Sequence, residues 1–424
     1  MANIAVVCPP LPGHLNPMAN LGRGLKERGH SVTVFNIPAL EQTVRSEGLA
    51  FHPFGGHNAD LLGRAVALMA QQRGLMSLRF AVECSRRVSE LLCEQLPAAL
   101  INSDIDLVMV DQNEPAGGSV AQYLGLPFIN ICPSLPLNRE ADIPAPFVSR
   151  QFVASRASRL RNRIEHRVAD WLISPINRTI NRYRAAWGLW PLRSPDDSFS
   201  DLAQLSQMTA DVDFPRKRLP SCFHYLGPFC SRVGETIPFP FEQLNGRPLI
   251  YASLGTLQER DSRYFAIIAE ACAGMEVQLV ISLGGRDANQ EMELAGSPLV
   301  VKYAPQLEIL ARASVTITHA GLNTVMQSLM FGVPMVAIPI THDQPAIATR
   351  VQRSGAGEAI PIRDLTAPRL RAALDRVMND PKYRIRAKQI STSIRTAGGI
   401  GRAVAIVEEI LARSGSRKDA LRHH

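Results

Sequence analysis

The feature that most constrains the fold of this chain is the stretch from Tyr303 to Gln344. The β-branched run Val315–Thr318 predicts a buried strand, which leads through the small residues around Ala320 into a helical pattern that ends at Gly332. A strand that enters a helix in this way aims the free N–H groups of the helix N-terminus at the space above the strand. The stretch therefore predicts an anion site, above all one for phosphate.

Polar side chains surround this predicted helix N-terminus. Asn323 and Gln327 are four residues apart and share one helix face, with Thr324 beside them and His319 just before the helix. The next predicted strand ends in the polar residues 341–344, which suit sugar hydroxyls. A diphosphate with its ribose and sugar fits this pattern. A plain β-α-β unit with helix-capping residues is the weaker alternative, because polar residues gather at both strand ends.

The stretch resembles the C-terminal signature of the family 1 (UDP-sugar) glycosyltransferases, which have the GT-B fold. The resemblance implies donor contacts to the base from Tyr303, Ala304 and Gln306, to the diphosphate from His319, Gly321, Asn323 and Thr324, and to the sugar from Asp343 and Gln344. Relatives usually have Glu at the position of Gln327. A carboxylate accepts hydrogen bonds from both ribose hydroxyls, whereas an amide offers one acceptor oxygen and a donor, so we expect a weaker ribose contact here.

The N-terminal part of the chain predicts a doubly wound parallel sheet. Short apolar runs predict strands at Ile4–Cys8, Ser31–Phe35, Leu107–Asp111 and Phe128–Cys132. A Pro/Gly loop over Pro9–Asn16 and a helix over Pro17–Arg28 connect the first two. Ligands of such sheets bind at the carboxyl ends of the strands, where His14 and Asp111 both lie.

Transfer of a sugar to a hydroxyl needs a base for the acceptor's proton. A histidine with a near-neutral pKa suits this role, and a carboxylate can orient it and stabilise its charged form. The segment PPLPGHLNP resembles the family's N-terminal loop, in which the histidine is the base. The resemblance thus implies a catalytic pair of His14 and Asp111.

The length of 424 residues accommodates two domains, and 46% apolar with 20% charged residues is typical of a globular protein. We expect an acceptor-binding domain over residues 1–226, a linker over 227–246, a nucleotide-sugar-binding domain over 247–395, and over 396–424 a helix that returns to the first domain, with a frayed tail. Leu249–Thr256 predicts a strand entering a glycine turn, and the family's matching loop faces the diphosphate. The resemblance therefore adds Ser253 and Thr256 to the donor site.

The predicted compartment is the cytoplasm. Seven cysteines without a C-x-x-C pair indicate neither a disulfide framework nor a zinc site, and the chain shows no signal peptide or membrane-spanning run. The net charge of +8 fits an anionic partner, a nucleotide or a lipid surface. The arginine-rich segment Arg139–Arg193 has two interpretations: a solvated pair of helices covering the sheet, which we favour, or a peripheral membrane contact.

Four short stretches in both halves are similar to the zeaxanthin glucosyltransferase branch of the family: DQNEPAG, LPLNRE, DFPRK and SLGTLQ. The resemblance implies inverting, metal-independent transfer of a hexose, glucose in the first place, from UDP-sugar to a lipophilic alcohol such as a carotenoid. UDP-sugar is then a donor substrate and no cofactor is expected. Asp211-Val-Asp213 has the spacing of a metal site, but it lies away from the predicted phosphate loop and is interpreted as a turn.

Other functions remain as alternatives. The acceptor could be a macrolide, a flavonoid or another natural-product alcohol. A nucleotide-sugar-binding protein without activity would be expected to lack the pair of His14 and Asp111. An NAD-dependent oxidoreductase is disfavoured, because no G-x-G-x-x-G follows the first strand.

Overall fold

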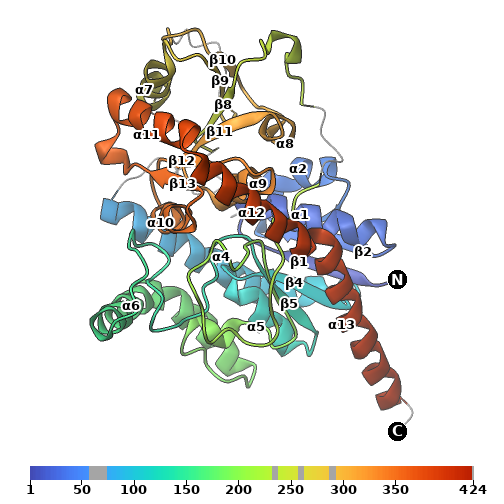
Figure 1. Ribbon diagram of the computed structural model, residues 1–424. Coiled ribbons are helices and arrows are strands. Elements are labelled where there is room, and N and C mark those ends of the chain that lie inside the picture. Colours follow the sequence, from blue (N-terminus) through green and yellow to red (C-terminus); the bar gives the residue numbers. More distant parts are fainter. Residues whose placement is uncertain (57–73, 232–236, 256–261, 286–292, 423–424) are drawn as a thin grey trace.

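The computed structural model describes residues 1–56, 74–231, 237–255, 262–285 and 293–422, and its two parallel sheets confirm the predicted α/β class (Figure 1). The strands of the first sheet are β1 (Asn3–Val7), β2 (Ser31–Asn36), β3 (Ala50–Pro53), β4 (Leu107–Asp111), β5 (Phe128–Cys132), β6 (Gln204–Ser206) and β7 (Phe223–Tyr225). Those of the second are β8 (Leu249–Ser253), β9 (Gln278–Ser282), β10 (Leu299–Val301), β11 (Ala313–Thr318), β12 (Met335–Ala337) and β13 (Gly357–Ala359).

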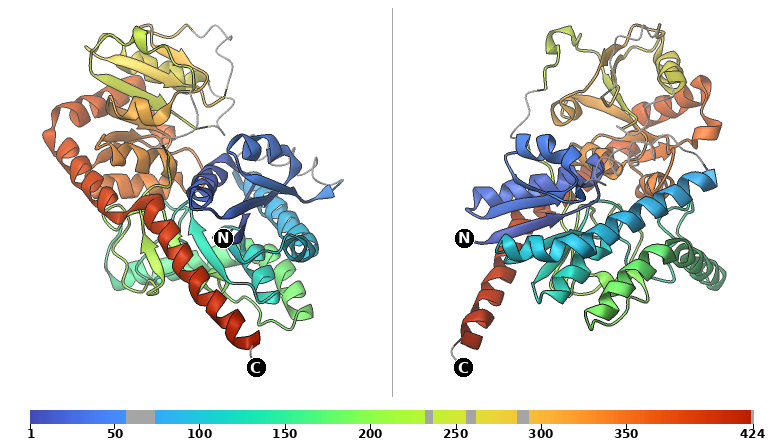
Figure 2. Two further views of the ribbon diagram at one scale, coloured as in Figure 1. Left: turned by 90° about the vertical axis from the view of Figure 1, so that its right-hand side faces the viewer. Right: turned by 180° about the vertical axis from the view of Figure 1, so that it is seen from behind.

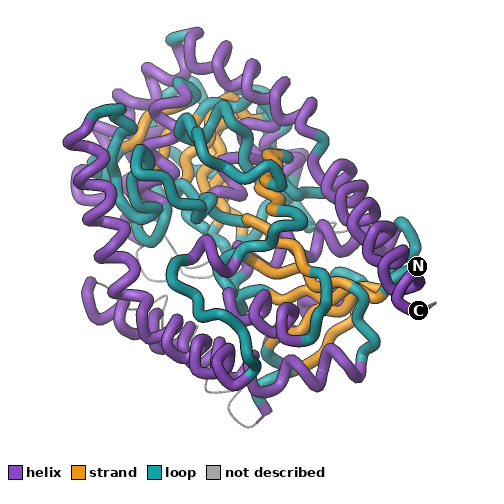
Figure 3. The backbone as a smooth tube through the Cα atoms, turned by 90° about the horizontal axis from the view of Figure 1, so that it is seen from below, coloured by secondary structure: helices purple, strands orange, loops and turns teal. Residues whose placement is uncertain are grey.

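Helices surround both sheets, and in Figure 3 the strands run through the interior between them. The first part of the chain contains α1 (Pro12–Glu27), α2 (Glu41–Ser46), α4 (Gly74–Asn102), α5 (Pro115–Tyr123) and α6 (Arg156–Ala186). The second contains α7 (Ser262–Cys272), α8 (Gln306–Leu310), α9 (Leu322–Met330), α10 (Gln344–Ser354), α11 (Ala367–Asn379), α12 (Pro381–Ala397) and α13 (Gly399–Arg422). Short 3-10 turns are η1 (Pro38–Leu40), η3 (Pro195–Ser198), η4 (Phe241–Gln243) and η5 (Ile362–Asp364). Strands covered on both faces are buried along their whole length, as β4 and β8 are, and each is apolar up to its polar last residue, Asp111 or Ser253.

The strand order creates one crevice at the edge of each sheet. The orders are β3-β2-β1-β4-β5-β6-β7 and β10-β9-β8-β11-β12-β13, so the direction of winding reverses between β1 and β4 and between β8 and β11. Val7 pairs with Val110, which brings the residues after β1 beside Asp111. Ser253 pairs with Thr318 in the same way, beside His319. Ligands of such sheets bind at these reversal points, and each half therefore offers one binding edge.

The C-terminal helix packs on the first half of the molecule. In Figures 1 and 2, α12 and α13 follow one another from the second sheet down to the first. Val404 and Val407 of α13 belong to the core of the first sheet. A Cβ added at Gly24 of α1 would lie 2.6 Å from Ile400, so the two helices approach where α1 has no side chain.

The two halves share a core and a buried ion cluster. Met208 and Val212 of the first half pack with residues of α9, α10 and α12 in one apolar cluster. Beside it, Oδ1 of Asp213 accepts a 2.8 Å hydrogen bond from Nε of Arg350 on α10, and Oδ2 accepts one of 2.7 Å from Arg216. Burial would raise the pKa of Asp213, but the two arginines outweigh it and hold that pKa well below its usual range.

The structure corrects four details of the sequence prediction. Helix α1 begins at Pro12 rather than Pro17, because proline is favourable in the first helical turn, so His14 lies in that turn and not in a loop. Strand β12 ends at Ala337, three residues before Ile340, where the sequence predicts its end. The arginine-rich segment holds one helix, α6, instead of a pair. Residues 414–422, predicted to be frayed, continue α13.

Replacing Arg350 with Met should destabilise the protein by about 3 kcal/mol, because it leaves part of the charge of Asp213 buried without its partner. Urea unfolding at pH 7 measures this change. The matched control is Arg369→Met on α11, whose side chain is exposed and which should change stability by no more than about 0.5 kcal/mol. Equal effects of the two substitutions would contradict a structural role for the cluster.

Candidate active site

His14 and Asp111 meet at the reversal point of the first sheet. Nδ1 of His14 lies 2.7 Å from Oδ2 of Asp111, while Oδ1 of Asp111 accepts a 2.9 Å hydrogen bond from the backbone N–H of Asn113. The carboxylate is fully buried and the imidazole is 19% exposed. An Nδ1–H that donates to the carboxylate leaves Nε2 as the free basic nitrogen.

The surroundings raise the pKa of His14 above its ordinary value. Burial alone would lower it, but the charge and hydrogen bond of Asp111 outweigh burial, and Asp343 and Glu114 act in the same direction. Asp343 is the residue directly before α10, in the second half of the chain. Its effect shows that the two halves bring charged groups together at this point.

Glu114 is a buried carboxyl group beside this pair that the sequence prediction did not single out. It is 4% exposed and lines the cavity, and Ser89 donates a long hydrogen bond of 3.4 Å to its Oε1. Burial and the neighbouring charge of Asp111 raise the pKa of Glu114 to about 8. At neutral pH this carboxyl is therefore mostly protonated and able to donate a hydrogen bond into the cavity.

The anion site of the second half is built around His319. A Cβ at Gly255 would lie 2.7 Å from the His319 ring and one at Gly321 only 2.5 Å away, so the ring fits between two glycines. Burial lowers the pKa of His319 to about 4, opposed only in part by the backbone of Ser253. The imidazole is neutral, so it can offer an N–H to an anion at the start of α9 but not a full positive charge.

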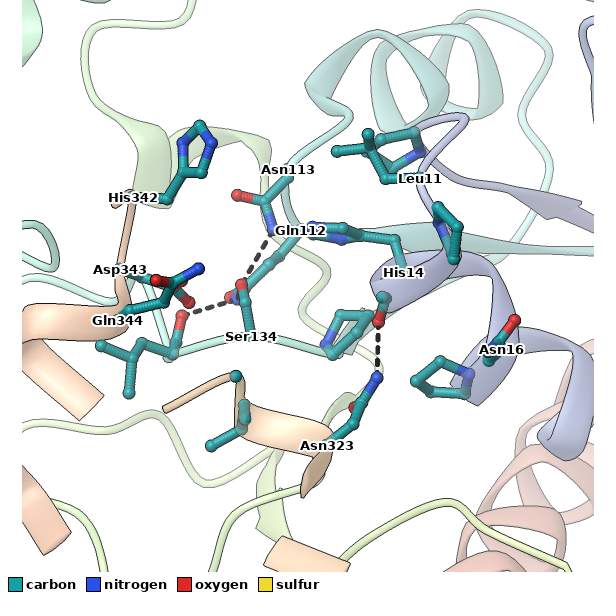
Figure 4. Close-up of a pocket in the computed structure, with 18 of the residues that line it drawn as sticks. Leu11, His14, Asn16, Gln112, Asn113, Ser134, Asn323, His342, Asp343 and Gln344 are labelled. Carbon is teal, nitrogen blue, oxygen red and sulfur yellow. Dashed lines mark hydrogen bonds between the residues drawn. The ribbon is translucent and has the colours of Figure 1, made fainter. Parts of the chain in front are cut away.

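Asn323 connects the two halves across the cavity. Its Nδ2 donates to the backbone oxygen of Gly13 (3.0 Å), next to His14, and its Oδ1 accepts from Gln207 (2.9 Å), as Figure 4 shows for the first of these bonds. Thr324 follows it in the first turn of α9 and also lines the cavity. The predicted diphosphate residues therefore lie opposite the predicted base.

The residues predicted to bind the nucleobase of the donor lie on one side of this cavity. The ring of Tyr303 is 47% exposed, and a Cβ at Gly285 would come within 2.4 Å of its hydroxyl, so the glycine makes room for the ring. Gln306, at the start of α8, donates to Oε1 of Gln327 and accepts from Tyr251 (3.1 Å). Ala304 lies between them in sequence and lines the cavity.

The predicted sugar-binding residues are held at the N-terminus of α10. Oε1 of Gln344 accepts from the backbone N–H groups of Ile340 and Thr341, both at 2.9 Å, which leaves its amide nitrogen for a ligand. Asp343 is the residue before the helix, and burial raises its pKa. His342 has a positive φ of 56°, a strained conformation that is concentrated at functional sites.

One cavity of about 730 Å³ joins these groups. Most of the predicted site residues line this cavity: His14, Ser253, Tyr303, Ala304, Gln306, His319, Gly321, Asn323, Thr324, Gln327, Asp343 and Gln344. Asp111 lies directly behind His14. Thr256 falls outside the described residues. Within the described part of the chain there is no group of three or more His, Cys, Asp or Glu side chains arranged to hold a metal ion.

Gln207 and Tyr251 were missed by sequence reasoning, although both hold predicted site residues through hydrogen bonds. Gln207 belongs to no recognisable motif, and Tyr251, although it lies within Leu249–Thr256, is an ordinary residue of a predicted buried strand. Glu114 lies inside the DQNEPAG stretch quoted above, but its burial depends on residues distant in sequence.

Comparison with known proteins shows similarity along nearly the whole chain. A family model described as UDP-glucoronosyl and UDP-glucosyl transferase matches residues 24–423. The chain is 35% identical to the zeaxanthin glucosyltransferase of Pantoea ananas, over 97% of this chain and 96% of that protein. It is also 35% identical to the zeaxanthin glucosyltransferase of Pseudescherichia vulneris, over 98% and 100%. A crystal structure of the glycotransferase of kitacinnamycin has the same fold, with a TM-score of 0.75, 24% identity, and coverage of 97% and 99%.

Asp111→Asn should shift the acid limb of the pH dependence of kcat/KM to lower pH. The raised pKa of His14 means that the free base is lost as pH falls through a value above 6.5, and removing the carboxylate lowers that pKa. The same change should reduce kcat roughly 10²–10⁴-fold, because the neutral ring is no longer held in its working tautomer. An acid limb that does not move would exclude Asp111 as the group that tunes His14.

Glu114→Gln should weaken the dependence of stability on pH. The native carboxyl keeps its proton up to about pH 8, whereas the unfolded one loses it near its ordinary pKa of 4.5. The resulting contribution to stability is fully present below about pH 4.5 and lost as pH rises towards 8. Between pH 5.5 and 7.5 the unfolding free energy of the wild type should fall by up to about 3 kcal/mol relative to the variant. Parallel curves from urea unfolding would contradict the raised pKa.

Proposed function

Because the chain belongs to the UDP-glucoronosyl and UDP-glucosyl transferase family, we propose that it transfers glucose from UDP-glucose to the hydroxyl of a lipophilic alcohol, with inversion and without a metal ion. The chain is a UDP-glycosyltransferase; the donor sugar, the acceptor and the independence of metal are the proposal. The observation that carries it is the pair of His14 and Asp111 facing the N-terminus of α9 across one cavity.

In the proposed reaction, Nε2 of His14 takes the proton of the acceptor hydroxyl while its oxygen attacks the anomeric carbon. The bond from that carbon to the diphosphate oxygen breaks, and UDP leaves from the opposite side, so the configuration inverts. The hydroxyl loses its proton late, because its pKa lies far above that of imidazole. Asp111 stabilises the imidazolium that results.

The leaving diphosphate gains negative charge, which the protein would offset without a cation. The free N–H groups at the start of α9, the side chains of Asn323 and Thr324, and the neutral ring of His319 are the donors available for this. Asn323 would then exchange its bond to Gly13 for one to the diphosphate, so donor binding would loosen one contact between the halves.

The assignment of a lipophilic acceptor is supported by the lining of the cavity around His14. Apolar side chains from α4, α6 and the loops after β1 and β5 contribute most of this region, among them Leu11, Val88, Leu135, Phe147 and Ile176. Two relatives at 35% identity are named for zeaxanthin, a long diol. The cavity also has to hold the donor, so such an acceptor would enter by its hydroxyl end alone, with the rest of its chain outside.

The test is a mass-spectrometric product screen with UDP-glucose and dTDP-glucose as donors and with carotenoid, macrolide and flavonoid alcohols as acceptors. We expect a monoglucoside of the carotenoid diol from UDP-glucose, at a rate unchanged by EDTA. His14→Ala should lower this rate by roughly 10²–10⁴-fold but leave the affinity for UDP nearly unchanged in calorimetry. Loss of turnover in EDTA that Mg²⁺ restores would refute the metal-independent mechanism, and a preferred macrolide or flavonoid would refute the acceptor.

A further inference from the structure

The first half of α6 has its polar side chains turned towards the protein. Asn162 is buried and donates to the backbone oxygen of Ala141 at 3.0 Å, and His166 lies 3.0 Å from that of Ile143. Glu165 pairs with Arg150, and Asp170 with Arg139. This inner face fastens the helix to the loop over residues 139–150 by hydrogen bonds and ion pairs rather than by apolar packing.

The opposite face of the same helix is apolar and exposed. Leu160, Ile164, Val168 and Trp171 are 61%, 53%, 49% and 71% exposed. Their spacing of four, four and three residues places them in one stripe along the helix. A surface helix of a water-soluble protein normally shows the reverse arrangement, with apolar residues inside and polar residues outside. We call these four residues the α6 stripe.

Arginines without acidic partners flank the α6 stripe. Arg156, Arg163 and Arg167 lie beside it, and Arg178 continues its line two turns beyond Trp171. All four are exposed, and none pairs with an acidic side chain within the described part of the chain. The two carboxylates in this half of the helix, Glu165 and Asp170, are already paired with arginines of the 139–150 loop.

The α6 stripe lies next to the acceptor side of the cavity. Ile173 and Ile176, two and five residues beyond Trp171, line the cavity, and so does Phe147 of the 139–150 loop, which is 43% exposed. Figures 1 and 2 place α6 at the outer edge of the first half, on the side away from α13. Ile173 and Ile176 project from the face of α6 opposite the stripe, so the stripe and this part of the cavity lining lie on two faces of one helix.

We propose that the α6 stripe and its arginines dock this protein on the surface of a bilayer with anionic headgroups. The apolar side chains would enter the boundary between headgroups and acyl chains, and the arginines would bind lipid phosphates. A protein partner would need acidic groups all around an apolar centre to pair with the arginines. An anionic bilayer offers phosphates at its surface and acyl chains beneath them at every point. The delivery of a lipophilic acceptor to the cavity rests on the function proposed above, but the docking itself does not.

The test measures sedimentation of the purified full-length protein with vesicles of phosphatidylcholine, with and without phosphatidylglycerol. We expect binding that depends on the anionic lipid and weakens in high salt. The double substitution Arg163→Glu with Ile164→Asp should reduce the partition coefficient about tenfold or more, because it reverses one charge and adds another at the surface. Arg384→Glu with Ile385→Asp on α12 is the matched control, since Ile385 is equally exposed at 55% and should not affect binding.

Two further readouts separate the possible outcomes. Transfer to a water-soluble alcohol should be the same in both variants and the wild type, whereas transfer to an acceptor dissolved in anionic vesicles should fall only in the α6 variant. Equal vesicle binding by all three proteins would overturn the proposal. So would self-association through this face, detected as a dimer by sedimentation that the α6 variant alone abolishes. Docking without any transfer would uphold the surface and refute the acceptor assignment.

Discussion

The relative position of the two halves depends on the buried contact between Asp213 and Arg350. Arg350 belongs to α10, which begins at Gln344 directly after Asp343, so the ion pair ties the helix that carries the predicted sugar-binding residues to the first half of the chain. Desolvating these charges is costly, and the cluster is favourable only because Arg216 and Tyr225 complete the hydrogen bonds of the carboxylate. The shared apolar cluster beside it supplies packing, and the ion cluster adds a specific geometry.

Two of the histidines that line the cavity, His14 and His319, show how that geometry separates two roles. Both rings are largely withdrawn from water, yet the pKa of His14 rises because Asp111 lies 2.7 Å away, while burial lowers that of His319 to about 4. The first ring can accept a proton near neutral pH, and the second remains a neutral donor beside an anion site. The different environments of the two rings thus distinguish His14 as the candidate proton acceptor from His319 as a neutral hydrogen-bond donor.

The unusual polarity of α6 also follows from the contacts that surround it in the folded protein. Polar side chains on its inner face bind the 139–150 loop by hydrogen bonds, so the helix is held without apolar packing on that face. The apolar side chains lie on the outer face and are exposed. The sequence pattern alone is compatible with a helix facing either way. For that reason the solvated interpretation and the membrane interpretation are both compatible with the sequence.

Much of the fold and of the site was determined by local sequence. The apolar runs that became β1, β4 and β11, and the glycine-containing turns that follow strands, specify their structure within a few residues, so Asp111 and His319 could be placed at strand ends from the sequence alone. Only the tertiary structure decided the bond from Asn323 to Gly13, the protonation of Glu114, the pairing of Asp213 with Arg350 and the direction in which α6 faces. The physical reason is that each of these depends on burial or on contacts with residues tens to hundreds of positions away, which no local pattern encodes.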